Sequence, residues 1–403
     1  MKQVLIKTMA VTALLFTTSD VFSQYTFYKP TAGFGIEISL SNTTLKRMPV
    51  YRNAVASLTV TGDHIIGGTA AGEKLDPYIF VASLSKREMV QMKDISTVIK
   101  GQRSIRSGFF KTGSNQLYAG TMAQQNSDGT NGSGHLIQVN VSAEGNINVT
   151  DLGVPVTGEG VFALCGNDHT GMLYGITYPS GIFFSYDLKA GKTKTYNNTV
   201  PTKEALETLT NEFHKKPEDF LCSSLIVDAK GMVYGSQPIN KVFCFNPADE
   251  SFRVLSDLPE VWGRHVLGRV ESWTKSADGM LYGGNAGDGQ LFSLDPATGK
   301  VKNLGKPIMM NRLRGLSFAA DGKLYGIAGA APGYAHLFSY DPAGVGYTDM
   351  GNPQFILKAP GIEQGIEWRG FQLGTITTSE DGKYVVMGED EALSQLLVFP
   401  VDN

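Results

Sequence analysis

The chain has 403 residues, of which 42% are hydrophobic and 10% aromatic, and its formal net charge is −3. A chain this apolar can bury a large core, which excludes a disordered protein, and its near-neutral charge gives no indication of a nucleic-acid partner. Length alone suggests two or three domains, but that expectation is weak for all-β folds, which often form one large domain.

The first 23 residues have the three parts of a secretory signal peptide. Lys2 and Lys7 supply positive charge, residues 9–16 are apolar, and Val21 and Ser23 are placed as the residues that precede the cleavage site. The apolar run is too short to span a bilayer, and no later segment is long and apolar enough to do so. The sequence therefore predicts a secreted or periplasmic protein without a membrane span; an uncleaved anchor is the alternative.

A unit of four short strands recurs along the rest of the chain. Its clearest copies begin at Thr170-Gly171, Ala229-Lys230-Gly231, Ala277-Asp278-Gly279 and Ala320-Asp321-Gly322, and weaker copies begin near Gly62, Ser114 and Glu380. In these units an Asp-Gly hairpin, or a near relative of it, leads into a short strand that ends in Tyr-Gly in the clearest copies. An aromatic strand, a second turn that is Asp-Pro in the clearest copies, and a fourth strand follow. One such sheet cannot bury both faces, so the units must stack around an axis. This pattern predicts a seven-bladed β-propeller as one domain over residues 24–403.

The two ends of this region fit a closed ring. The last copy stops after its third strand, Leu396–Pro400, and the stretch Phe34–Leu40 alternates like a strand before the first full copy. We expect the N-terminal strand to complete the last blade, which would leave few exposed sheet edges. A separate N-terminal hairpin is the alternative.

One insertion, residues 202–216, has helical rather than strand periodicity. Leu206, Leu209 and Phe213 recur at helical spacing, Thr202 is a suitable N-cap, and Pro217 ends the pattern. This predicts a helix between the third and fourth blades.

Three cysteines, Cys165, Cys222 and Cys244, lie in apolar strand segments. We expect all three to be buried as small hydrophobic residues, because a domain of this size does not need disulfides. A bridge between Cys222 and Cys244 is the alternative.

Function is expected on the face that carries the long loops, at the mouth of the central channel, because binding residues concentrate on loops of a rigid scaffold. Charged residues precede the first strands of several blades there. The candidate substrate-binding residues are Arg103, Arg106, Arg264, Arg269, Arg312, Arg314, Trp368 and Arg369. The planar guanidinium fork suits carboxylate, sulfate or phosphate. Alternatively, some of these arginines pair with Glu159, Glu271 or Glu367 and tie the blades together.

His265 is the best candidate for a catalytic base, because it lies between Arg264 and Arg269 in the sequence. Tyr178, on the same face, is a second candidate, with blade packing as its alternative role. His135 and His336 occupy the same position in their repeats, which favours a structural role. No histidine pair has the spacing of metal ligands, so we expect neither a metal nor a cofactor.

The repeats, together with the predicted export, resemble secreted bacterial propellers. In layout the chain is similar to seven-bladed polysaccharide lyases and related glycosidases that act on uronate-containing glycans. The resemblance lies in the blade units and carries no matched active-site motif. It implies an anionic polysaccharide or oligosaccharide as partner. It also implies β-elimination, in which a His or Tyr removes the proton beside the uronate carboxyl group and Arg neutralises that carboxylate.

The sequence thus favours a monomeric, extracytoplasmic polysaccharide lyase. Two alternatives stay open, because propellers serve many functions. One is a noncatalytic module that binds glycan or protein through the same face. The other is a metal-dependent, lactonase-like hydrolase with Glu159 as a ligand, which would need several oxygen ligands to converge.

Overall fold

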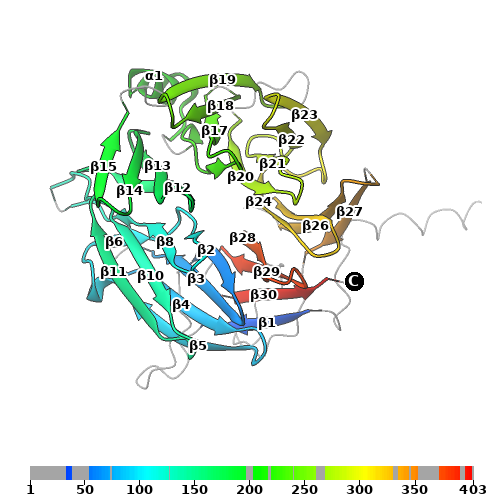
Figure 1. Cartoon of the computed structure of the whole chain (residues 1–403), viewed down its shortest axis with the longest axis horizontal. Coiled ribbons are helices and arrows are strands. Elements are labelled where there is room, and N and C mark those ends of the chain that lie inside the picture. Colours follow the sequence, from blue (N-terminus) through cyan, green and yellow to red (C-terminus); the bar gives the residue numbers. More distant parts are fainter. Residues whose placement is uncertain are drawn as a thin grey trace, which may run out of the picture.

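Seven antiparallel sheets are arranged as blades around a central axis (Figure 1). The computed structural model describes residues 33–38, 54–72, 75–126, 128–196, 203–216, 219–238, 240–259, 268–329, 335–344, 346–352, 372–390 and 395–401. Each blade has four strands in a meander, and the first strand of each blade lies innermost. The predicted seven-bladed β-propeller is confirmed.

The strands follow the sequence order of the repeats. Blade 1 contains β2 (Ala54–Thr61), β3 (His64–Ala70), β4 (Tyr78–Ser83) and β5 (Glu88–Asp94); blade 2 contains β7 (Phe110–Lys111), β8 (Leu117–Gly120), β10 (Leu136–Val141) and β11 (Ile147–Gly153); blade 3 contains β12 (Gly160–Asn167), β13 (Met172–Tyr178), β14 (Phe183–Asp187) and β15 (Lys192–Thr195). Blade 4 contains β16 (Ile226–Val227), β17 (Val233–Gln237), β18 (Lys241–Asn246) and β19 (Ser251–Asp257); blade 5 contains β20 (Val270–Lys275), β21 (Leu281–Asn285), β22 (Leu291–Asp295) and β23 (Lys300–Gly305). Blade 6 contains β24 (Leu313–Phe318), β25 (Leu324–Ala328), β26 (His336–Asp341) and β27 (Gly346–Gly351), and blade 7 contains β28 (Leu373–Thr378), β29 (Tyr384–Glu389), β30 (Gln395–Pro400) and β1 (Phe34–Glu37).

Two short strands and a helical turn lie between blades 1 and 2. The strands β6 (Gln102–Ser104) and β9 (Met122–Ala123) extend the blade 1 sheet, and η1 (Ile95–Thr97) is a single 3₁₀ turn. They carry the chain from the outer edge of blade 1 back toward the axis.

The N-terminal strand closes the ring, as the sequence predicted. β1 pairs antiparallel with β30, with Phe34 opposite Val398 and Glu37 opposite Gln395 (Figure 1). Its Ile36 is buried together with Val398 and Val386. The alternative of a separate N-terminal hairpin is wrong, because this strand supplies the fourth position of blade 7.

The Tyr-Gly element of the repeat has a direct steric cause. In five blades the glycine at this position of the second strand lies opposite a phenylalanine of the third strand, and the phenyl ring covers the glycine; in blade 1 this glycine follows Ile66 instead of a tyrosine. The pairs are Gly67–Phe80, Gly175–Phe184, Gly235–Phe243, Gly283–Phe292 and Gly326–Phe338. A Cβ on any of these glycines would lie 2.1–2.6 Å from a ring atom, where no side chain fits. The repeat therefore encodes an aromatic layer inside each blade.

The tyrosine of the same element fastens the preceding hairpin. Tyr325 Oη donates to Asp321 Oδ2 at 3.0 Å, and Tyr234 Oη donates to Asp228 Oδ2 at 3.0 Å. Gly322, within the Asp321 turn, has a φ of +77°, a conformation that glycine adopts without strain. The turn residues and the strand that follows them thus act as one unit.

The predicted insertion forms α1 (Lys203–Phe213), on the face where the inner strands begin. Its Leu206 is buried, and Leu209 and Phe213 pack against the same cluster, which includes Phe162 and Phe220. The predicted bounds of 202–216 were slightly too long, because the helix ends before His214, whose φ is +50°. Within the described residues, no helix has the length and apolarity needed to cross a membrane.

All three cysteines are buried and unbridged. Cys165 and Cys222 belong to one apolar cluster between blades 3 and 4, and Cys244 belongs to the cluster between blades 4 and 5. Their predicted role as small core residues is confirmed, and the alternative bridge between Cys222 and Cys244 is not formed.

Candidate functional site: an axial cavity

A cavity of about 560 Å³ lies on the propeller axis and is lined by residues from all seven blades. We call it the axial cavity. Its mouth is the end at which the inner strands begin, because Arg269 and Arg312 immediately precede β20 and β24, and Asp390 immediately follows β29. The first and second strands of a blade are antiparallel, so the second strand ends on the face where the first strand begins. Arg269, Arg312 and Asp390 therefore all lie on the face that the sequence predicted to carry function.

A β-bulge at the same point of several inner strands aims one side chain into this cavity. The pairing between first and second strands shifts by one residue at Ala56, Phe162, Glu271, Arg314 and Gly374. All five residues line the cavity. A bulge leaves one residue out of the regular pairing and redirects its side chain, which is how these strands present a residue to the axis.

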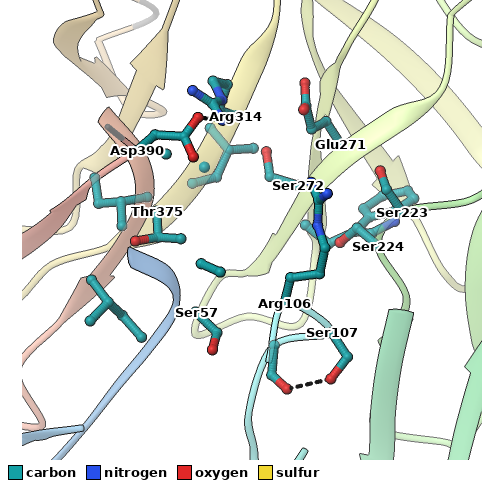
Figure 2. A pocket seen from close by; sticks show the side chains of 18 of the residues that line it. Ser57, Arg106, Ser107, Ser223, Ser224, Glu271, Ser272, Arg314, Thr375 and Asp390 are labelled. Atoms are coloured by element: carbon teal, nitrogen blue, oxygen red, sulfur yellow. Dashed lines mark hydrogen bonds and ion pairs between the residues drawn. The ribbon is translucent and has the colours of Figure 1, made fainter. Parts of the chain in front are cut away.

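The same position is occupied by Arg106 in blade 2 and by Ser223 in blade 4. The residue before this position makes the same backbone hydrogen bond in blades 2 and 3. Ile105, which precedes Arg106, donates from its backbone N to Thr69 O of blade 1, and Val161, which precedes Phe162, donates from its backbone N to Thr121 O of blade 2. Ala56, Arg106, Phe162, Ser223, Glu271, Arg314 and Gly374 are the bulge positions. They place two guanidinium groups, a carboxylate, a hydroxyl, an aromatic ring and two small residues around the cavity, and Figure 2 shows Arg106, Glu271 and Arg314 among them.

Two ion pairs join neighbouring blades at the mouth. Arg312 of blade 6 forms a two-pronged pair with the carboxylate of Glu271 in blade 5. Arg314, also of blade 6, pairs with Asp390 of blade 7 and donates from Nη1 to Leu373 O at 3.1 Å (Figure 2). These contacts confirm in part the alternative that the arginines tie blades together.

Glu271 is strongly held in its charged form. Burial alone would favour the neutral acid, but the hydrogen bonds and charge of Arg312, with Arg269 and Arg314 nearby, outweigh burial and lower the pKa of Glu271 to about 2. Its side chain is only 11% exposed. The carboxylate is therefore a permanent negative charge set among guanidinium groups.

The other two arginines of the cavity have contacts of a different kind. Arg269 Nε donates to the neutral hydroxyl of Ser223 at 3.2 Å. The Arg106 guanidinium lies over the Phe162 ring, with Cζ 5.6 Å from the ring centre. The described lining residues thus include four guanidinium groups and two carboxylates, those of Glu271 and Asp390.

The hydroxyl groups next to the bulge positions serve the scaffold. Ser57 Oγ donates to Ile105 O of the next blade at 2.6 Å, and Ser272 Oγ donates to Leu313 O of the next blade at 3.0 Å. These bonds hold adjacent inner strands at a fixed distance. They also keep the bulge positions in place around the axis.

The structure brings together only part of the predicted set. Arg106, Arg269, Arg312 and Arg314 line the axial cavity. Arg103 does not: it lies on β6, pairs through its backbone with Ala71, and exposes its side chain. His265, Arg264, Trp368, Arg369 and Glu367 lie outside the described residues.

Tyr178 is placed beside the cavity rather than in its wall. Its ring packs on Phe162, with ring centres 5.9 Å apart, in the cluster that also holds α1. It is absent from the described cavity lining. This position fits the packing alternative, and a catalytic role for Tyr178 stays a prediction.

His135 and His336 have the paired, structural positions that their equivalence in the repeat indicated. His135 Nδ1 lies 2.9 Å from Asp151 Oδ1, and His336 Nδ1 lies 2.9 Å from Asp349 Oδ1, each across to the fourth strand. Neither lines the axial cavity.

The residues proposed for a metal do not form a donor set. Both carboxylate oxygens of Glu159 accept hydrogen bonds from Ser180, one from its backbone N at 3.0 Å and one from its hydroxyl at 2.6 Å. Glu271 is paired with Arg312. Within the described residues, no three His, Cys, Asp or Glu side chains converge as metal ligands would.

Asp390, Phe162, Ser223 and Gly374 are cavity residues that the sequence reasoning missed. The wall needs glycine at position 374, because a Cβ there would lie 2.9 Å from the Asp390 Cβ. A repeat alignment of the inner strands, counted back from each hairpin, would have found Phe162, Ser223 and Gly374. Asp390 follows a second strand and carries no such signal.

No family model matches the chain, and no curated protein matches its sequence. Among solved structures, 1129 chains match its fold, so the fold alone selects no function. A virginiamycin B lyase from Staphylococcus aureus is 10% identical with a TM-score of 0.58, over 92% of this chain and 100% of that chain.

Two extracellular domains from B. thetaiotaomicron are also similar in structure. The one assigned to a hybrid two-component system is 14% identical, with a TM-score of 0.59, over 92% of this chain and 41% of that chain. The one assigned to a one-component system is 13% identical, with a TM-score of 0.54, over 93% of this chain and 40% of that chain. The chain thus spans about two fifths of these two proteins, and at such low identity the likeness is one of fold.

Proposed function

We propose that the protein binds an anionic, uronate-containing saccharide in the axial cavity, outside the cytoplasm. The observation that carries this proposal is the excess of guanidinium over carboxylate groups among the described lining residues at the mouth. Binding, rather than catalysis, is the function that the geometry supports best, because that lining contains no His, Tyr or Lys to act as a base.

The cavity wall has the groups that such a ligand needs. Arg269, held by a neutral hydroxyl, keeps its charge available for a ligand carboxylate, and guanidinium–carboxylate hydrogen bonds are among the strongest that proteins form. A volume of about 560 Å³ is in the range of small-molecule sites.

The proposed location rests on the N-terminal sequence. Residues 1–23, which have the pattern of a secretory signal peptide, lie outside the described residues. Two of the similar solved structures are themselves extracellular domains. We propose that the mature protein begins near residue 24 and is exported as a monomer.

Isothermal titration of the mature protein with uronate oligomers tests this function. We expect trigalacturonate or a glucuronate- or mannuronate-containing oligomer to bind, and neutral oligosaccharides of equal length to bind at least tenfold more weakly. Arg269→Gln should weaken binding by about tenfold or more, since a hydrogen bond to a charged group contributes about 1.5–3 kcal/mol. Binding should also weaken as salt is raised, through screening.

Arg253→Gln is the matched control, because Arg253 is exposed on the outer strand β19, away from the axis. It removes the same charge from the chain and should leave the affinity within about twofold, as for other surface substitutions. Equal losses in the two variants, or no binding of any uronate oligomer, would contradict the proposal.

A second candidate function is β-elimination of the same ligand, as the resemblance to polysaccharide lyases implies. The observation in its favour is that Arg269, in the cavity wall, follows His265 by four positions in the chain. The base would take the proton beside the carboxyl group, the glycosidic C–O bond at the β carbon would break, and a C=C bond would form. The leaving oxygen takes up a proton, and no water is consumed.

Ultraviolet absorbance of the unsaturated uronate product measures this reaction directly. If the proposal holds, absorbance rises with a uronate polymer, the rise survives a chelator, and His265→Ala abolishes it while trigalacturonate still binds. A fully active His265→Ala variant would move the base elsewhere, with Tyr178→Phe as the next variant to assay. Binding without any rise would leave recognition as the whole function.

A further inference from the structure

The wall of the axial cavity is layered along the propeller axis. At the mouth lie Arg269 and Arg312, then the bulge positions, then the hydroxyls of Ser57, Ser272 and their equivalents. Two residues beyond each bulge position the lining turns apolar. This apolar layer consists of Leu58, Leu164, Leu225, Trp273, Leu316 and Ile376, with Gly108 in blade 2.

The described lining ends at the apolar layer. The residues that follow it on the inner strands, such as Val60 of β2 and Ser317 of β24, do not line the cavity. Beyond it the blades are joined to one another: Ser317 Oγ lies 3.1 Å from Thr378 Oγ1 of blade 7. Lys111 of blade 2 donates to Val60 O of blade 1 at 3.2 Å and also pairs with Glu380 of blade 7.

The two ends of the cavity therefore differ in what they accept. A sugar with many hydroxyls loses its hydration when it is pressed against this apolar layer, whose only side-chain donor, the Trp273 indole N–H, is itself buried, and a buried hydroxyl whose hydrogen bonds are not replaced is destabilising. The charged mouth, by contrast, replaces hydration with guanidinium contacts. A polymer passing through the ring of blades would have to bring unpaired hydroxyls across the apolar layer.

Most of the charged groups among the described lining residues belong to blades 5 and 6. Blades 5 and 6 supply Arg269, Arg312 and Arg314, whereas blades 7 and 1 present Gly374 and Ala56 at the bulge positions. The small side chain of Ala56 leaves space along blade 1, whereas the Asp390 side chain packs against Gly374 in blade 7. The arrangement gives room for one sugar ring beside Ala56, with its carboxylate turned toward the arginines of blades 5 and 6 and away from Asp390.

We propose that the axial cavity takes the terminus of an anionic saccharide chain, inserted end-on from the mouth, and does not bind internal stretches of a polymer laid across the face. This inference rests on the proposed binding of uronate saccharides and specifies the part of the ligand that is recognised. The charged mouth holds the terminal uronate, and the apolar layer sets the depth of insertion.

Isothermal titration against galacturonate chains of increasing length tests this mode of binding. The ligands are the trimer, the hexamer and a long polygalacturonate of known mean length, each supplied as a solution of known chain concentration. End-on insertion predicts one protein bound per chain at every length, with an affinity per chain end that changes by less than about threefold beyond the trimer. Stoichiometry that rises with chain length would overturn end-on insertion.

A substitution at Ala56 provides an independent readout. Ala56→Phe places a bulky ring at a bulge position and should weaken binding of the trimer at least tenfold, whereas a polymer lying across the face would be little affected. Ala277→Phe is the matched control, because Ala277 is exposed in the β20–β21 turn on the opposite face. Near-ultraviolet circular dichroism establishes that both variants are folded before the titration.

The outcomes separate this inference from the proposed function on which it rests. If several proteins bind each long chain, and Ala56→Phe binds it normally, the saccharide is bound laterally and end-on insertion is wrong, while uronate binding stands. If neither the trimer nor the polymer binds to the unmodified protein, the proposed function itself is wrong, and this inference falls with it.

Discussion

The interiors of the blades and the wall of the axial cavity are built on the same repeat but use it in opposite ways. Inside the blades, five of the second-strand positions carry glycine under a phenylalanine ring of the third strand. At the bulge positions the backbone recurs just as regularly, yet the seven blades present Ala, Arg, Phe, Ser, Glu, Arg and Gly. The repeated side chains build the scaffold, and the unrepeated ones give the cavity its chemistry.

This difference follows from the contacts that each position must make. A residue that faces the next strand of its own blade has similar neighbours in every blade, so the same residue types recur at that position. A residue aimed at the axis meets no fixed partner within its blade, and nothing in the scaffold requires it to match its equivalents. Variation at a conserved backbone position is therefore the mark of a site in a repeat protein.

Glu271 is the strongest test of the distinction between scaffold residues and cavity residues. It occupies a bulge position and also joins blades 5 and 6 through Arg312. Its pKa falls from an ordinary 4.5 to about 2 in the folded protein. Such a shift corresponds to about 3 kcal/mol of stability at neutral pH. We expect Glu271→Gln to lower the free energy of unfolding by about that amount, measured by urea denaturation at pH 7.

The pH dependence supplies the check on this prediction. Because folding lowers the pKa, the contribution of Glu271 is complete above about pH 4.5 and is lost as the pH falls toward 2. The stability difference between the two proteins should therefore shrink from pH 6 to pH 3. Glu250→Gln, which removes an ion pair with Lys194, is the control and should change stability little, because the pair is exposed to solvent. A constant difference across this range would assign the loss to packing.

The second prediction concerns the repeated layer inside the blades. A Cβ at position 283 would lie 2.2 Å from the Phe292 ring, so Gly283→Ala forces the ring or the strand to move. Overpacking of this kind costs about 1–3 kcal/mol, and we expect the urea midpoint to fall accordingly. Affinity for the uronate trimer should stay within about twofold while the protein is folded.

Gly346→Ala is the matched control for that substitution. Gly346 lies on the outer strand β27, has an ordinary φ, and has no neighbouring atom within 4 Å of the added Cβ. It should leave stability unchanged or slightly raised, through lower entropy of the unfolded chain. If the two glycine variants were equally stable, the Gly–Phe layer would not be what the repeat preserves.

Most of the fold was predictable because the repeated contacts are local. Asp-Gly hairpins, Tyr-Gly strands and aromatic third strands each act within about 20 residues, so they leave a readable pattern. The closing strand Phe34–Glu37 was also found, although it pairs with Leu396 and its neighbours across the whole chain. That long-range pairing was inferred from an incomplete last repeat, which is again a consequence of the pattern.

The site was predictable only in part, because it depends on hydrogen-bond register. Arg106 and Arg103 are three residues apart, but Arg106 occupies a bulge position whereas Arg103 belongs to the added strand β6 and points to solvent. Sequence alone shows where arginines precede inner strands and does not show which of them a bulge turns inward. Asp390 was missed for a related reason, since its approach to Arg314 joins two blades.

The smallest predicted effect concerns the repeated tyrosine of the second strand and compares two blades. Tyr234 and Tyr282 hold the same position in blades 4 and 5, but only Tyr234 donates to a turn carboxylate, Asp228, in a buried setting. The Tyr282 hydroxyl has no hydrogen-bond partner among the described residues, so the two tyrosines separate the hydroxyl's contribution from that of the ring.

Tyr234→Phe should therefore lower the free energy of unfolding by about 1–2 kcal/mol, because it leaves a buried carboxylate oxygen without its donor. Tyr282→Phe should change the free energy of unfolding by less than about 0.5 kcal/mol, since the ring is kept and no bond is lost. Urea denaturation of both variants at pH 7 measures the difference. Equal losses would mean that the repeated tyrosine acts through its ring alone, and that the Asp–Tyr bond of blades 4 and 6 adds nothing to the stability of the hairpin.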